Sequence, residues 1–277
     1  MSGWIVVGID GSPRALEAVR WAAAEAARRG VGLRLVAAVN TSDRPVLGFP
    51  IEPLLEPAKE DVARAAAEVA AAVPVDRKVE AGHPVAVLAA ESRHADLLVV
   101  GGSGYGRITG VLAGSVTVGV STQAACPVVV VRGAEHDRAA PVVLGVDATP
   151  VGEAAIAFAF DAAAARGVPL IAVHTWGAPP GDMRTAPQWE DLAERAERDL
   201  ADRLAGWTGR HPGVDVQRIV GRDHPADRLL ELSQQAQLVV VGSRGHGQLV
   251  GLFLDSVSHA MVHRAACPMA VVRPQEV

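Results

Sequence analysis

The sequence of 277 residues contains one pattern twice, and this internal repeat restricts the possible folds more than any other feature. Five pairs of segments match: Trp4–Asp10 with Pro141–Asp147 and Gly30 with Gly167 at an offset of 137 residues, and His83-Pro84 with His224-Pro225, Leu97–Gly101 with Leu238–Gly242 and Ala125–Pro127 with Ala266–Pro268 at an offset of 141. Chance similarity of apolar segments would not keep its register through glycine, His-Pro and Cys-Pro markers. The sequence therefore predicts a domain over residues 1–132, a polar linker over 133–140 and a second domain over 141–277.

The composition predicts a folded protein without a disulfide framework. Hydrophobic residues make up 49% and charged residues 21%, and there are only two cysteines. A net charge of -5 argues against nucleic acid as the main partner, because phosphate backbones attract basic surfaces. No apolar run reaches the roughly 18 residues of a membrane span, and Met1–Asp10 lacks the features of a signal peptide. We expect a cytoplasmic protein that contacts neither nucleic acid nor membrane.

Short apolar runs alternate with longer amphipathic stretches in each copy. In the first copy we expect strands at Ile5–Ile9, Leu33–Val39, Asp76–Glu80, Leu97–Gly101 and Val128–Arg132, and helices at Pro13–Arg29, Pro57–Ala72, Pro84–Arg93 and Ser115–Gln123. The three prolines that begin helices suit a first helical turn, where the missing N–H leaves no bond unmade. Runs such as Leu97–Val100 lack polar alternation, as is typical of strands buried on both faces of a parallel sheet.

The predicted fold class is therefore α/β, with two tandem Rossmann-like, doubly wound domains. Each is expected to hold a five-stranded, mainly parallel sheet flanked by helices. In such sheets ligands bind beyond the carboxyl ends of the strands, where the strand order reverses. Residues that directly follow strands are therefore the first candidates for a site.

The most informative segment, Gly101–Ser115, is rich in glycine and lies between a buried strand and a helix. Glycines let backbone amides approach a ligand closely, and with a helix amino terminus these amides form an anion site. Without a ligand, the same composition describes a flexible turn. The motif GxxxxGK[ST] is absent because Arg107 replaces its lysine, and GxGxxG and GxSxG are absent as well.

A different motif, G-x2-G-x9-G-[ST], is satisfied by Gly101, Gly104, Gly114 and Ser115. With the strand endings Val7–Ser12 and Leu144–Thr149 and the Cys-Pro segments before valine-rich runs, it makes the chain similar to the universal stress protein family over nearly its whole length. The motif is that family's ATP-binding signature. The resemblance implies that Asp10 lies beside the adenosine and that the backbone of Val39 meets the adenine.

The resemblance further implies that the phosphates and ribose of ATP are held by Gly101, Gly104, Gly114, Ser115 and Val116. We expect Mg²⁺ to accompany the nucleotide. The other candidate nucleotide contacts are Gly8, Arg107, Gly145, Asp147, Gly242, Arg244, Gly245, Gly247, Ser256 and Val257. For Asp10, capping of the helix that begins at Pro13 is a second interpretation, and both roles are compatible.

The second copy departs from the motif because Asp255 stands where the third glycine should be. A carboxylate there repels a phosphate by roughly 4 kcal/mol per charge pair at ~4 Å in a medium of effective dielectric 20. Mg²⁺ or Arg244 would offset this charge. Trp176 replaces Val39, and its ring either stacks on a base or fills the pocket. We predict weaker or altered nucleotide binding in this copy.

Several other signals are interpreted as structural. His259 and His263 share a helix face but have no third metal ligand placed by a pattern, and Cys126 and Cys267 resemble small buried residues. The His-Pro pairs start helices, with the histidine either capping or lining the mouth of the cleft.

Three function classes follow. The first is an ATP-binding regulator or sensor in stress or slow growth, with slow hydrolysis at most, because no general base or lysine clamp is evident. The second is an ATP-using enzyme of the ATPase or adenylating type, and the third a scaffold without nucleotide. In the family the final strands pair across domains, so the resemblance implies an intramolecular pseudo-dimer, with a homodimer of two chains as a further level of self-association.

Overall fold

The computed structural model describes residues 3–40, 51–69, 71–102, 115–133, 137–147, 152–175, 189–243, 254 and 256–273. The chain divides into two compact units, Met1–Arg132 and Gly133–Val277, and each is described by itself.

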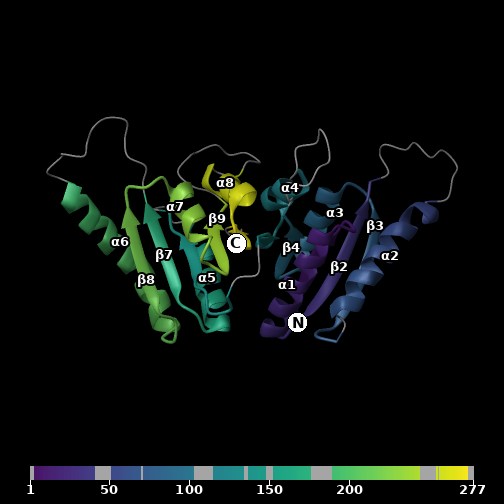
Figure 1. Cartoon of the computed structure of the whole chain (residues 1–277), viewed down its shortest axis with the longest axis horizontal. Coiled ribbons are helices and arrows are strands. Elements are labelled where there is room, and N and C mark those ends of the chain that lie inside the picture. Colours follow the sequence, from purple (N-terminus) through teal and green to yellow (C-terminus); the bar gives the residue numbers. More distant parts are fainter. Residues whose placement is uncertain are drawn as a thin grey trace. The chain divides into compact units, whose positions relative to one another are not determined.

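The first unit is a five-stranded parallel sheet with helices on both faces (Figure 1). Its elements are β1 (Trp4–Ile9), α1 (Pro13–Arg29), β2 (Gly32–Val39), α2 (Glu52–Val69), β3 (Val75–Ala81), α3 (Pro84–Glu91), the short 3-10 helix η1 (Ser92–His94), β4 (Leu97–Gly101), α4 (Ser115–Gln123) and β5 (Val128–Val131). The strand order is β3-β2-β1-β4-β5. Helices α1 and α2 pack together on one face, and α3 and α4 on the other.

The second unit repeats this arrangement with the strand order β10-β9-β6-β7-β8. Its elements are β6 (Val142–Gly145), α5 (Glu153–Arg166), β7 (Leu170–Thr175), α6 (Trp189–Arg210), β8 (Val216–Gly221), α7 (Pro225–Leu232), β9 (Leu238–Gly242), α8 (Ser256–Arg264) and β10 (Met269–Val272). All the strand pairs of this unit are parallel. The predicted fold class, a duplicated, doubly wound α/β fold, is confirmed.

Burial explains why the central strands read as unbroken apolar runs. In β1 and β4, the side chains of Ile5, Val7, Leu97 and Val99 are 0% exposed, because helices cover both faces of the sheet. Each such side chain stabilises the fold by about 1.5–3 kcal/mol relative to an exposed one.

Two of the three helices predicted to begin at a proline do so, at Pro13 and Pro84. Helix α1 spans the predicted residues, and the hydroxyl oxygen of its N-cap, Ser12, accepts a hydrogen bond from the Ala15 amide. The prediction that Pro57 begins a helix is wrong, because α2 begins at Glu52 and Pro57 lies inside it. A proline there removes only the bond to the carbonyl of Pro53, and the rest of the helix still packs on the sheet.

In each unit one serine side chain holds the turn that contains the Cys-Pro segment. The hydroxyl of Ser92 donates to the Ala89 carbonyl and accepts from the amide of Ala125, just before Cys126. Ser233 makes the equivalent two bonds, to the Leu230 carbonyl and from the Ala266 amide. These bonds fix the turn that leads into the last strand of each unit, so the markers have a structural role.

Burial also makes the two thiols unreactive. It raises the pKa of both Cys126 and Cys267 to about 12, so almost no thiolate exists at neutral pH. We expect the folded protein to resist alkylation by iodoacetamide at pH 8, whereas both thiols should react after unfolding in urea. Mass spectrometry of the alkylated protein measures this difference, and complete labelling of the folded chain within minutes would contradict it.

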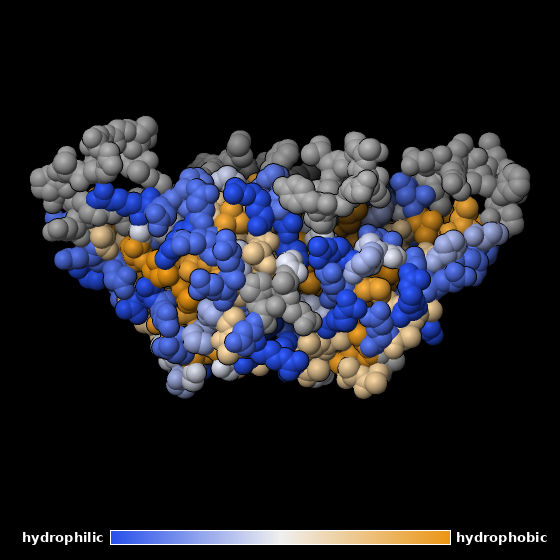
Figure 2. Space-filling view, in the orientation of Figure 1, coloured by the Kyte–Doolittle hydropathy of each residue, from blue (hydrophilic) through white to orange (hydrophobic). Residues whose placement is uncertain are grey.

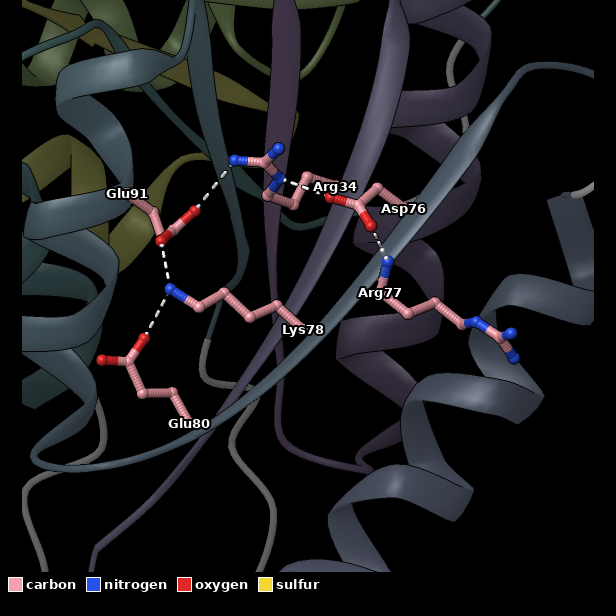
Figure 3. A network of polar contacts seen from close by, with 6 residues as sticks. All are labelled: Arg34, Asp76, Arg77, Lys78, Glu80 and Glu91. Atoms are coloured by element: carbon pink, nitrogen blue, oxygen red, sulfur yellow. Dashed lines mark hydrogen bonds and ion pairs between the residues drawn. The ribbon is translucent and has the colours of Figure 1, made fainter.

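A network of charged side chains lies on the α3 face of the first unit, over β2 and β3 (Figure 3). Arg34 contacts Asp76 at 2.8 Å and Glu91 at 3.4 Å, and Lys78 contacts Glu80 at 2.7 Å and Glu91 at 2.8 Å. Hydrogen bonds to Glu80 and Glu91 raise the pKa of Lys78 above 10.5. The stabilisation from Lys78 is therefore present below about pH 10.5 and is lost as the pH rises through its raised pKa.

The second unit replaces the centre of this network by apolar residues. At the positions of Arg34, Lys78 and Glu91 it has Ile171, Ile219 and Leu232. The same sheet face is thus held by ion pairs in one copy and by apolar side chains in the other.

This substitution pattern predicts a non-additive response. Glu91→Leu alone should lower the free energy of unfolding by about 2 kcal/mol, because it leaves two neighbouring cations without their shared carboxylate. The triple variant Arg34→Ile, Lys78→Ile, Glu91→Leu should recover to within about 1 kcal/mol of the wild type. Urea unfolding measures both effects without adding screening salt. A triple variant less stable than the single one would contradict this account.

The surface of both units is mainly hydrophilic on the face shown in Figure 2, with hydrophobic residues in smaller areas between. Among the described residues, only Ile51 and Leu192 are large hydrophobic residues with substantial exposure. Within the described segments, no helix combines the length and the apolar character needed to span a membrane.

Candidate functional site

The strand order of the first unit places three predicted contacts on neighbouring strand ends. Asp10 follows β1, Val39 ends β2 and Gly101 ends β4, and β1 pairs with both other strands. Parallel strands end at the same edge of a sheet, so these residues lie at one edge, where the strand order reverses.

Asp10 has a local role and also faces solvent. Its Oδ1 accepts a hydrogen bond from the amide of Ser12 at 3.0 Å, which shapes the turn before α1. Ser12, and not Asp10, caps the helix. Within the described part of the chain no hydrogen bond is made by Oδ2, and this exposed oxygen is placed to accept one from a ribose hydroxyl or an adenine amine.

Three of the predicted site glycines serve packing. A Cβ on Gly101 would lie 2.8 Å from the backbone carbon and oxygen of Arg14, so β4 ends directly against the first turn of α1. A Cβ on Gly8 would lie 3.1 Å from Leu88 of α3, and Gly145 has the same relation to Leu229 of α7 at 3.0 Å. Gly8 and Gly145 therefore let a helix approach the sheet.

The backbone carbonyl of Val39 already makes a hydrogen bond within the protein. Its carbonyl accepts a hydrogen bond from the amide of Gly82 at 2.9 Å, in the turn after β3. The side chain is half-buried at the strand end, where it can cover part of a flat base.

Asp61 is a residue of this region that the sequence does not reveal. Gly11 has a φ of 76°, and a Cβ there would lie 2.3 Å from Oδ2 of Asp61 on α2. Asp61 also pairs with Arg64. The Asp61 carboxylate thus lies against the turn after β1, at the residue that follows Asp10. The sequence gives no signal for this contact because α2 follows β1 by more than forty residues.

The remaining predicted contacts of the first unit surround the glycine-rich segment. Helix α4 begins at Ser115, directly after that segment, and Val116 is its half-buried second residue. Gly104, Arg107 and Gly114 lie outside the described residues.

The second unit has a cavity of about 650 Å³ between its strand ends and α6. Val146, Asp147 and His174 line it from the ends of β6 and β7, and Leu192 and Arg203 line it from α6. Leu192 is 46% exposed, so an apolar side chain is open to a ligand at this wall. Asp147, the counterpart of Asp10, is therefore part of a cleft at the predicted edge of the sheet.

Polar contacts fix the walls of this cavity. The guanidinium of Arg203 donates to the carbonyl of Asp147, and a Cβ on Gly152 would lie 3.1 Å from Asp147 Oδ1 and 3.4 Å from Arg203 Nη2. His174 Nδ1 lies 2.9 Å from the carbonyl of Val146, which can only accept, so this nitrogen carries a proton. The first unit has Ala37 at the position of His174.

The end of β9 is held by α8. Ser258 donates to the carbonyl of Gly242 at 2.6 Å, which brings the start of α8, with exposed Ser256 and half-buried Val257, to this strand end. The hydroxyl of Ser243 is buried and has no hydrogen-bond partner within the described part of the chain. Arg244, Gly245, Gly247, Asp255 and Trp176 lie outside the described residues.

The comparison with protein-family models decides the identity of both units. The model described as "Universal stress protein family" matches residues 1–132 and again residues 140–273. The chain belongs to the universal stress protein family. The resemblance noted from the sequence is thereby confirmed.

Known universal stress proteins match nearly the whole chain. Universal stress protein Rv2623 of Mycobacterium tuberculosis is 39% identical over 284 residues, covering 97% of this chain and 96% of its own. A universal stress protein of Mycolicibacterium smegmatis is 39% identical over 289 residues, covering 98% and 97%. The crystal structure of a universal stress protein from Archaeoglobus fulgidus superposes with a TM-score of 0.75 at 20% identity, covering 99% of both chains, and so shares the fold.

The structure describes the surroundings of the four histidines that the sequence singles out, and it contradicts side-chain capping by His83 and His224. The rings of His259 and His263 lie 4.5 Å apart on α8, and among the described residues no group of three or more potential ligands gathers around a metal position. His83 and His224 occupy the N-cap positions of α3 and α7, but neither side chain makes a capping hydrogen bond.

Proposed function

We propose that this universal stress protein is a regulator that binds ATP, with Mg²⁺, chiefly in its first copy. The observation that carries the proposal is the arrangement around β1. The ends of three adjacent strands bear Asp10, Val39 and Gly101, and α4 begins directly after the glycine-rich segment that follows β4. A helix amino terminus that follows such a segment is suited to bind phosphate.

The two copies differ in charge at the nucleoside end of the site. The first copy has the carboxylates of Asp10 and Asp61 near the turn after β1. The second copy has the Arg203 guanidinium bound to the carbonyl of Asp147, and it has Asp255 in place of the third motif glycine. The Asp255 carboxylate, which would repel a phosphate, supports binding of ATP chiefly in the first copy and altered binding in the second.

Slow or absent hydrolysis is part of the proposal. Among the described residues, no lysine or histidine lies at the carboxyl end of β1, β2 or β4 to act on a terminal phosphate. The protein would then work as a nucleotide-dependent sensor in the cytoplasm, where unpaired buried thiols such as Cys126 remain reduced. Self-association through the last strand of each copy stays a prediction.

Two measurements on the purified chain test this function. Mass spectrometry of the denatured protein should detect ATP that co-purifies at close to one molecule per chain, and loss of nucleotide would favour the scaffold alternative. Turnover of ATP should remain far below about 1 s⁻¹, a modest enzyme rate. Faster turnover would favour the enzyme alternative.

A further inference from the structure

Two side chains of the second unit place buried polar atoms where the first unit has only apolar side chains. Thr175 ends β7 and is 8% exposed, and Arg228 is the fourth residue of α7. The Thr175 hydroxyl and the Arg228 Nε are both fully buried, and among the residues that the structure describes neither has a hydrogen-bond partner. The corresponding residues of the first unit are Ala38 and Val87.

The first unit shows that these two positions face each other. Glu91 of α3 contacts Arg34 of β2, so this side of the helix lies over this face of the strand. Val87 is one turn before Glu91, and Ala38 is four residues after Arg34 on the same face. Because the helix runs back from the carboxyl end of the sheet, both positions lie toward that end.

The same relation holds in the second unit, where α7 packs on β7. Helical side chains lean toward the helix amino terminus, so Arg228 leans toward the end of β7, where Thr175 lies. In the first unit, Cγ2 of Val87 lies 3.0 Å from a Cβ built on Gly82, which places the side chain of this position against the turn before the helix.

This pair lies on the opposite face of the sheet from the cavity of the second unit. His174 lines that cavity on the α6 side, and successive residues of a strand point to opposite faces, so Thr175 points to the α7 side. The two locations are therefore separate.

The chemistry of the pair fits an oxyanion. Nη1 of Arg228 pairs with Glu231, which holds the guanidinium in place and leaves Nε to donate elsewhere. A buried donor without a partner is unfavourable, and a guanidinium with a hydroxyl beside it supplies the planar set of donors that phosphate accepts. The amino terminus of α7, whose N-cap His224 makes no side-chain capping bond, adds a favourable dipole.

We propose that Thr175 and Arg228 form a phosphate-binding site in the second unit, separate from the nucleotide cleft. The site takes one phosphate group, with the Thr175 hydroxyl and the Arg228 Nε as donors. Glu231 carries the opposite charge, and Asp223 and Asp227 nearby are exposed and screened by solvent, so affinity in the millimolar range is expected. The proposal does not depend on ATP binding in the first copy.

Nuclear magnetic resonance on the full-length, ¹⁵N-labelled chain tests this site, with inorganic phosphate as the probe at constant ionic strength. We expect saturable shifts of the amides of Thr175 and of residues 221–228. The variants Thr175→Ala and Arg228→Val carry the residues of the first unit and should fold, as the dispersion of their spectra will show. Their dissociation constants for phosphate should be at least about tenfold higher, since each removes a hydrogen bond to a charged group.

Arg198→Val is the matched control, because Arg198 is an exposed arginine of α6 with a similar ion pair to Glu194. It should leave the phosphate shifts unchanged. The proposal is overturned if residues 175 and 221–228 show no saturable shift, which would mean that the buried atoms bind water only. It is equally overturned if the shifts persist in Arg228→Val, or if they are confined to residues 101–116 and 242–257.

Discussion

Gly101→Val is expected to lower the free energy of unfolding of the first unit by about 3 kcal/mol or more. Valine would place its Cβ 2.8 Å from the backbone carbon and oxygen of Arg14 and 3.1 Å from the amide nitrogen of Ala15. These are backbone atoms of the first turn of α1, so no side chain can rotate away to make room. The helix must move off the sheet, which opens the core beneath it.

Gly102→Ser provides the matched control, because the second copy already has Ser243 at this position. A Cβ on Gly102 meets the Cβ of Arg132 at 3.0 Å and the carbonyl oxygen of Val131 at 3.2 Å, and we expect a smaller loss, of about 1–2 kcal/mol. Urea unfolding followed by circular dichroism compares the two variants. If Gly101→Val is as stable as Gly102→Ser, the close approach of β4 to α1 cannot be the reason for glycine at position 101.

Gly114→Asp should weaken ATP binding to the first copy by roughly a thousandfold. The substitution copies Asp255 into the intact motif. A carboxylate ~4 Å from a phosphate charge costs roughly 4 kcal/mol at an effective dielectric of 20, and each 1.4 kcal/mol is a factor of about ten. Equilibrium dialysis with ATP and Mg²⁺ measures the change, and circular dichroism should show an unchanged fold.

The reverse substitution, Asp255→Gly, completes this test. It removes the repelling charge from the second copy, so the number of ATP molecules bound per chain should rise toward two. An unchanged affinity in Gly114→Asp, together with unchanged stoichiometry in Asp255→Gly, would show that these positions do not face the phosphates.

Most of the fold is predictable because local and non-local signals agree. The repeat defines two equivalent units, and the unbroken apolar runs give strands within one or two residues of their ends. The exception at Pro57 arises because a single missing hydrogen bond is outweighed by burial of Val62, Ala65 and Val69 along the same helix.

The site is predictable only where it follows from strand order. Asp10, Val39 and Gly101 lie at one edge because parallel strands end together. Asp61 on α2 and Arg203 on α6 also reach the strand ends of their units. Both helices are far along the chain from these strand ends, and no sequence motif links the two, so these contacts could not be predicted. A glycine in the sequence can indicate either a ligand contact or close packing. Gly8 and Gly145 match the family pattern, yet in the structure they lie against helices.

Isothermal titration calorimetry of the intact chain with ATP and Mg²⁺ measures directly whether the first copy binds ATP. We expect saturable heat with close to one ATP bound per chain and a marked loss of affinity in Gly114→Asp. Absence of any saturable heat, with the chain shown to be folded and free of retained nucleotide, would contradict this expectation.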